Sequence, residues 1–275
     1  PKTKIKIEKC KKNEKGTEII FTPDETIFET TKFSPKKLYD FIKMKAVLVA
    51  GTYIDFKIDK DLINDNTPDY EKFHFKNGIA EFLNIKNKNT PKLFDKQFSI
   101  TKNINENEKC ELFISFNQND KASLISFCNT IETPDGGSHE NGFKNGILKA
   151  LKLYGQKNQV SKISNININD LIDFSDIVIS IFINEPSFEG QTKKRIIMPK
   201  LQKQIESTIQ NEFLLWLNSN KKITKILIET LIERSLLRTD LTKIKELERK
   251  SFKERHKLPG KLVDCSSKKI ENTEL

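Results

Sequence analysis

The spacing of apolar and polar residues along this 275-residue chain switches between the period of strands and the period of helices. Two extended runs, Lys2 to Ile7 and Gly16 to Phe21, are separated by a polar turn and predict two adjacent strands. Ser34 and Pro35 are residue types that favour a helix N-cap and a first helical position, so a helix is predicted there. Thr52 to Ile58 alternates along its length and predicts another strand.

A polar stretch, Asp59 to Tyr70, predicts a loop in the next part of the chain, and a short helix is expected after Asn77 and Gly78. Three apolar runs that follow predict strands: Phe98 to Ile100, Cys110 to Asn117, and Ala122 to Asn129. Because only the short polar segment 118–121 separates the last two, we expect them to form a hairpin.

A turn, Thr133 to Gly137, begins the second half of the chain. It precedes a helix that Ser138 can cap and that is expected to end at Gly155. Asp176 to Ile183 is a continuous β-branched run, which is typical of a strand covered on both faces.

Two helices are predicted after that strand, one from Pro199 to Leu217 and one from about Ile223 to His256. No glycine or proline interrupts the second helix. Its first half is apolar, but the part from Lys243 onward is dominated by charge, so we expect it to leave the core and project. The order of strands and helices predicts an α+β fold.

The chain carries 48 Lys and Arg against 38 Asp and Glu, which gives a net charge of +10. Such a balance is compatible with a polyanionic partner such as DNA, because neutralising phosphates releases counterions. Lysines spread over solvated faces would give the same balance without any such partner. Charge alone therefore does not choose between these interpretations.

The four cysteines lack the paired spacing of metal sites and redox motifs; they are Cys10, Cys110, Cys128 and Cys265. Free thiols in a reducing cytoplasm are the simpler interpretation. No apolar run approaches the ~20 residues that a membrane helix needs. We therefore expect a soluble, cytoplasmic protein with no membrane partner.

Three short segments carry the candidate chemistry. In the first, Phe188 to Lys193, a lysine and an amide lie on a glycine-containing loop between a buried strand and a helix. Lys193 and Gln191 could reach a phosphate there, although a lone lysine on a loop is more often simply solvated.

The second segment, Pro134 to Phe143, places a Gly-Gly turn before a helix, where free backbone N–H groups can hold an anion. The alternative is a capped helix start with an ordinary histidine, His139. The third segment, Leu258 to Ser267, taken alone is a linker with a helix stop.

Together, and in this order, the three segments resemble the B subunits of bacterial type IIA DNA topoisomerases, the gyrase and topoisomerase IV pair. The turn is similar to the family's Gly-Gly-Thr-His helix start, with Ser138 in place of the threonine. The loop is similar to its Gln-Thr-Lys loop, and the last segment to its Leu-Pro-Gly-Lys-Leu-Ala-Asp-Cys sequence, with Val263 in place of the alanine. Pro23 to Phe28 and Lys45 to Leu48 look more like topoisomerase IV than gyrase.

The resemblance implies the fold and the domain bounds. Residues 1–76 would be the C-terminal part of a GHKL-type ATP-binding sandwich, and residues 77–242 a transducer domain of the ribosomal protein S5 domain 2-like fold. That domain would have a mainly four-stranded sheet, helices on one side and a left-handed crossover. Residues 243–275 would form a helical connector that leads into a TOPRIM domain.

The resemblance also implies ATP as a cofactor. Lys193 would contact the γ-phosphate of ATP as the catalytic residue of this segment, with Gln191 beside it and Thr17 near the adenine. The resemblance places the residues that bind Mg²⁺ outside this chain. It places the catalytic glutamate outside this chain as well. We therefore expect the intact subunit to hydrolyse ATP, and this chain alone neither to hydrolyse ATP nor to cleave DNA.

The partners implied by the resemblance are DNA, a topoisomerase A subunit in a heterotetramer of two A and two B subunits, and a second copy of the B subunit. Basic residues of the long helix would lie near captured DNA: Lys243, Lys245, Arg249, Lys250, Lys253 and Arg255. Two alternatives stay open. One is the second domain of a related mismatch-repair or chaperone ATPase, and the other is a non-enzymatic basic module that binds nucleic acid.

Overall fold

The computed structural model describes residues 19–118 and 122–255, which form an α+β fold with two sheets. The helices are α1 (Pro35–Leu48), α2 (Gly78–Lys86), α3 (Ser138–Lys157), α4 (Asn169–Ile172), α5 (Pro199–Ser219) and α6 (Lys221–Arg255). The strands are β1 (Tyr53–Lys57), β2 (Tyr70–His74), β3 (Phe98–Asn105), β4 (Glu108–Phe116), β5 (Ser123–Cys128), β6 (Ile131–Glu132) and β7 (Ser175–Phe182). Short 3₁₀ turns lie at Lys60–Leu62 and Ile163–Asn165.

Helix α1 begins as the sequence predicts. The Ser34 hydroxyl accepts the N–H of Lys37, and Pro35 occupies the first helical position. The helix packs beside the antiparallel pair β1 and β2, around a core that includes Phe56, Phe73 and Leu83. The pattern did not predict β2, because much of the strand is solvent-exposed and its first residues lie at the end of a polar stretch.

The larger sheet has the strand order β3-β4-β7-β5-β6, and only the β5–β7 pair is parallel. The predicted hairpin between β4 and β5 is therefore wrong: β7 lies between them, and the hairpin is β3–β4, closed at Asn105 and Glu108. A central position suits β7 because nearly all of it is buried. The left-handed sense expected for the β5–α3–β7 crossover stays a prediction.

Both faces of this sheet are covered, as predicted for the strand that became β7. Ile177 and Ile179 belong to the core under α3 and α5, whereas Val178 belongs to the core shared with α1 and α2. The expectation of helices on one side is thus incomplete, because α2 packs on the opposite face through Ile79 and Leu83. Apolar Phe113 and Phe127 on that face need such a cover.

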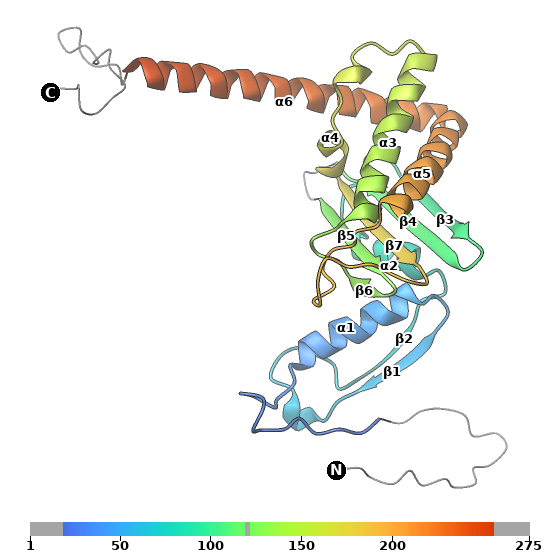
Figure 1. The fold of residues 1–275 in the computed structure, drawn as a ribbon, viewed down its shortest axis with the longest axis vertical. Coiled ribbons are helices and arrows are strands. Elements are labelled where there is room, and N and C mark those ends of the chain that lie inside the picture. Colours follow the sequence, from blue (N-terminus) through green and yellow to red (C-terminus); the bar gives the residue numbers. More distant parts are fainter. Residues whose placement is uncertain (1–18, 119–121, 256–275) are drawn as a thin grey trace, which may run out of the picture.

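Helices α3 and α5 run side by side over the sheet (Figure 1). They approach closely at two glycines of α3, since a Cβ on Gly142 or Gly146 would lie 2.7 Å from an α5 carbonyl oxygen. The predicted end of α3 at Gly155 is wrong. The helix continues to Lys157, and Gly155 leaves room for the side chain of Ile163.

The 35-residue helix α6 extends away from the sheet (Figure 1). Its first half packs on the core through Leu227, Ile228 and Leu231. Arg238 holds the helix to the body of the fold through its guanidinium, which binds both carboxylate oxygens of Asp170 at 2.8 and 3.1 Å. Residues 239–245 are all exposed, so the helix projects from this point.

Two early predictions meet different outcomes. Ile19, Ile20 and Phe21 are exposed and form no strand, because no segment within the described residues pairs with them. The predicted strand from Lys2 to Ile7 lies outside the described residues, as do Thr17 and the segment from Leu258 to Ser267. In the described parts of the chain, no helix is both long and apolar enough to cross a membrane.

Candidate functional site

The candidate loop connects β7 to α5 and is folded back on itself like a hairpin. Phe188 forms an antiparallel bridge with Ile196, and the N–H of Glu189 donates to the carbonyl of Arg195 at 3.0 Å. Below them, the N–H of Ile197 donates to Ser187 at 2.9 Å. These bonds give the loop, residues 187–197, a defined stem and leave residues 190–194 as its tip.

Both predicted phosphate-contacting residues lie at this tip, and both are exposed. The backbone N–H of Lys193 donates to the carbonyl of Gly190 at 3.1 Å, which closes a tight turn around Gln191. Lys193 itself has φ +56, a left-handed conformation that residues other than glycine adopt uncommonly. The side chain of Lys193 is exposed to solvent.

The structure brings together two of the segments singled out in the sequence, because the loop is fastened to the Gly-Gly turn. The N–H of Asp135 donates to the Lys194 carbonyl at 3.1 Å, and the N–H of Ile196 donates to the Gly136 carbonyl at 3.2 Å. Gly137 pairs with Ile196 in a parallel bridge. The turn is therefore the base on which the loop sits.

The predicted role of Ser138 as an N-cap is wrong. Gly137 is the N-cap of α3, and Ser138 is the first helical residue. The Ser138 hydroxyl instead accepts the N–H of Met198 at 2.7 Å, and its own N–H donates to the Ile196 carbonyl at 3.0 Å. The Ser138 hydroxyl bonds the loop and not its own helix, because the loop passes directly over the start of α3.

A buried polar network fastens the turn to strand β5. The Ser126 hydroxyl donates to a Glu140 carboxylate oxygen at 2.8 Å, and Thr133 bonds the Ser126 backbone through both its N–H and its hydroxyl. Lys144 lies 3.1 Å from the other Glu140 oxygen. Sequence reasoning missed this network, although Glu140 one turn after a Gly-Gly pair was a usable signal.

His139 is a buried member of the same network. Its Nε2 lies 3.1 Å from the Thr133 hydroxyl, which donates to Ser126, so Nε2 is assigned as the donor to Thr133. Burial lowers the pKa of His139 to about 4. The imidazole is therefore neutral at pH 7. At the helix start, the carbonyl of Ile196 in the loop accepts the N–H of Ser138.

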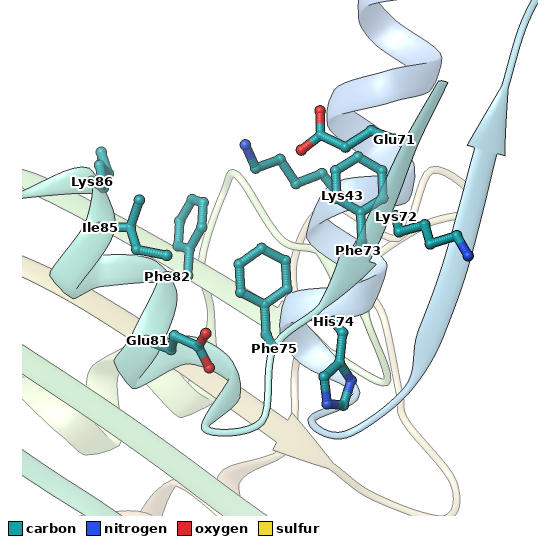
Figure 2. Close-up of a pocket in the computed structure, with 10 residues that line it drawn as sticks. All are labelled: Lys43, Glu71, Lys72, Phe73, His74, Phe75, Glu81, Phe82, Ile85 and Lys86. Carbon is teal, nitrogen blue, oxygen red and sulfur yellow. The ribbon is translucent and has the colours of Figure 1, made fainter. Parts of the chain in front are cut away.

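A groove of about 490 Å³ lies elsewhere, between β2 and α2 (Figure 2). Figure 2 shows the rings of Phe73, Phe75 and Phe82 along it, with Lys43 and Glu71 on the same side. No residue of the loop or the turn lines this groove. It belongs to the junction of α1, β2 and α2, and the candidate chemistry lies outside it.

No metal site is evident in the parts of the chain that the structure describes, where no three His, Cys, Asp or Glu residues gather to hold an ion. Cys110 and Cys128 are buried free thiols, and burial raises the pKa of each to about 12, so neither is a reactive thiolate. Cys10 and Cys265 lie outside the described residues.

Comparison with known proteins gives this arrangement a family. The model of the family described as DNA gyrase B matches residues 78–247, more than half of the chain. This chain belongs to the DNA gyrase B family. That membership tells against the mismatch-repair or chaperone alternative. It agrees with the resemblance in the first two segments, which lie within the matched residues.

Within the DNA gyrase B family, the chain is 36% identical to the B subunit of DNA topoisomerase 4 from Rickettsia felis, over 99% of this chain and 42% of the relative. It is 31% identical to the B subunit of DNA gyrase from Clostridium acetobutylicum, over 96% of this chain and 41% of the relative. The chain thus spans about two fifths of the length of these relatives.

A solved structure of the topoisomerase IV ATP-binding domain of Francisella tularensis has a similar fold. The TM-score is 0.66 at 26% identity, over 79% of this chain and 57% of that one. The α+β arrangement of this gyrase B family member is therefore similar to that of the Francisella tularensis domain.

Proposed function

We propose that this chain is the part of a topoisomerase IV B subunit that couples the binding and hydrolysis of ATP to the passage of DNA strands. The observation that carries the proposal is the loop tip, where Lys193 and Gln191 are exposed on a stem that is fastened to the starts of α3 and α5. The names of the relatives support the type of subunit, and an ATP-binding domain among similar structures supports the nucleotide.

Transfer of the terminal phosphoryl group of ATP to water develops negative charge on the phosphate oxygens. Lys193 stabilises that charge with its ammonium, and Gln191 contributes hydrogen bonds from its amide. Thr17 helps to hold the water and the carboxylate that read the adenine. The ligands of Mg²⁺ and the general base lie in other parts of the full-length protein.

The same loop passes the nucleotide signal to the rest of the chain. It leads through Met198 into α5, and α5 is followed directly by the projecting helix α6. A shift of the tip therefore moves the start of α5 and, through it, α6. In this proposal residues 1–76 end the ATP-binding domain, residues 77–242 form the transducer, and residues 243–275 lead toward a TOPRIM domain.

DNA contacts belong to the projecting part of α6. Lys243 and Lys245 are exposed there, and Arg249, Lys250, Lys253 and Arg255 follow in the same helix. These contacts are to phosphates and independent of base sequence, so they weaken as salt is raised. The assembly is two B and two A subunits in the cytoplasm, with the B subunits paired through their ATP-binding domains.

The test is ATP hydrolysis by the intact B subunit when it is assembled with its A subunit on DNA. Lys193→Ala should lower kcat about 100-fold, the scale of losing one charge-stabilising donor. Lys194→Ala is the matched control, because Lys194 is also exposed and lies next to Lys193. Unchanged hydrolysis in Lys193→Ala refutes the role of the loop, and DNA binding without any nucleotide response identifies a basic binding module instead.

A further inference from the structure

The side chain of Ser138 joins the starts of two helices, α3 and α5, that lie about sixty residues apart in the sequence. Ser138 is the first residue of α3 and is 7% exposed. Its hydroxyl accepts the N–H of Met198, and Met198 is the residue immediately before Pro199, which begins α5. One hydrogen bond of 2.7 Å therefore ties the start of α3 to the start of α5.

The start of α5 has no capping side chain of its own. Met198 is the N-cap of α5, yet it makes no side-chain capping bond, and Pro199 has no N–H to offer. Among the described residues, the Met198 N–H has the Ser138 hydroxyl as its partner. Removing that oxygen would leave a half-buried donor without a protein acceptor.

The bond also bears on the loop tip. Ser138 contacts the segment 196–198 twice, through its N–H to Ile196 and through its hydroxyl to Met198. Lys193 lies three residues before Ile196, at the end of the same short stem. The position of Lys193 is therefore set by the stem, and Ser138 sets where the stem ends.

We propose that Ser138 is a positioning residue for Lys193: its hydroxyl fixes the stem of loop 187–197 against α3 and joins movement of the loop to the start of α5. Ser138 does not touch the nucleotide. This inference rests on the proposed function of Lys193. It gives Ser138, which the sequence predicted to be a helix N-cap, a role in passing movement of the loop to α5.

The experiment compares steady-state ATP hydrolysis by intact B subunits, assembled with the A subunit and DNA. Ser138→Ala should lower kcat about fivefold with little change in KM, the scale of one lost hydrogen bond. Ser138→Thr should stay within about twofold of the parent, because threonine keeps the hydroxyl. Ser207→Ala, which removes an exposed hydroxyl from α5, is the matched control and should also change little.

The deciding readout is the double variant. If Ser138 acts through Lys193, Ser138→Ala has no further effect on kcat once Lys193 is alanine. The same fivefold loss in both backgrounds overturns the inference, and so does an unaffected kcat in Ser138→Ala. An unaffected kcat in Lys193→Ala alone refutes the proposed function instead, so the two failures are distinguishable.

If the Ser138→Ala variant fails to fold, a second measurement on the unsubstituted protein tests the same inference. Hydrogen exchange of the unsubstituted intact protein should show a protected amide at Met198, and a non-hydrolysable ATP analogue should increase that protection. Rapid exchange at Met198 in both states means that the Ser138 bond does not hold the stem, and it overturns the inference.

Discussion

Gly137→Ala tests whether the Gly-Gly turn is the base of the loop. Gly137 has φ +127, and a Cβ at this position would lie 2.2 Å from the carbonyl oxygen of Ile196 and 2.6 Å from its nitrogen. Both contacts are to backbone, so no side-chain rotation relieves them. The substitution must either move the loop off the turn or force the turn into another conformation.

The cost has two parts that can be stated separately. Holding alanine in this backbone region costs about 1–3 kcal/mol. Separating Ile196 from the turn loses its hydrogen bonds to Gly136 and Ser138, each worth about 1 kcal/mol net. The free energy of unfolding should therefore fall by about 4 kcal/mol, a large share of the ~5–15 kcal/mol typical of a folded domain.

The assay is urea unfolding of the 275-residue chain, followed by the fluorescence of its one tryptophan, Trp216, which stacks on Phe213 in the main core. Gly190→Ala is the control, because Gly190 has no positive φ and no atom within 4 Å of an added Cβ. It should change the free energy of unfolding by less than about 0.5 kcal/mol. Equal stability of the two variants would refute the reasoning.

The remaining predictions concern His139 and the clamp between Arg238 and Asp170. The folded-state pKa of His139 is lowered to about 4, so its neutral form is favoured on folding, and the stability this brings is lost as pH falls from about 6.5 to about 4. Measured unfolding free energy should drop by up to about 3 kcal/mol over that range, and His139→Gln should flatten the drop; an unchanged slope contradicts the assignment. Arg238→Met leaves the buried carboxylate of Asp170 unpaired and should cost about 2 kcal/mol in urea unfolding. The same change in an Asp170→Asn background should cost clearly less, and equal costs would mean that the pair is not coupled.

Local patterns predicted much of the fold. Ser34 and Pro35 placed the start of α1 correctly, because capping depends on residues close in sequence. The uninterrupted apolar run of β7 predicted a strand covered on both faces, and the periodic apolar residues of α5 predicted its extent to within two residues.

The same local patterns did not predict the order of the strands in the larger sheet. The segments that became β4 and β5 are separated by a few polar residues, which is a hairpin signal, yet the strand between them comes from residues 175–182. The residues around β4 and β5 do not indicate that β7, a more apolar strand later in the chain, takes the central position between them. The end of α3 was missed for a similar reason, since Gly155 serves a contact with Ile163 and not a helix stop.

For the candidate site, the sequence predicted which residues take part, and the structure showed how they are arranged in space. Gln191 and Lys193 were predicted by residue type and motif, and they lie together at one exposed tip. The link between this tip and the turn at Gly137 connects residues about sixty positions apart, so no spacing rule could find it. Ser138 illustrates the limit, because its hydroxyl bonds a distant backbone N–H that the sequence cannot place nearby.

The measurement that tests the central claim most directly is the chemical reactivity of Lys193 in the intact protein, with and without a non-hydrolysable ATP analogue. Lysine acetylation read by mass spectrometry reports each side chain separately, and Lys194 serves as the internal control. We predict that the analogue lowers modification of Lys193 about tenfold and leaves Lys194 unchanged, because the ammonium of Lys193 is held at a phosphate. Equal modification of Lys193 in both states would contradict the claim that this loop reaches the nucleotide.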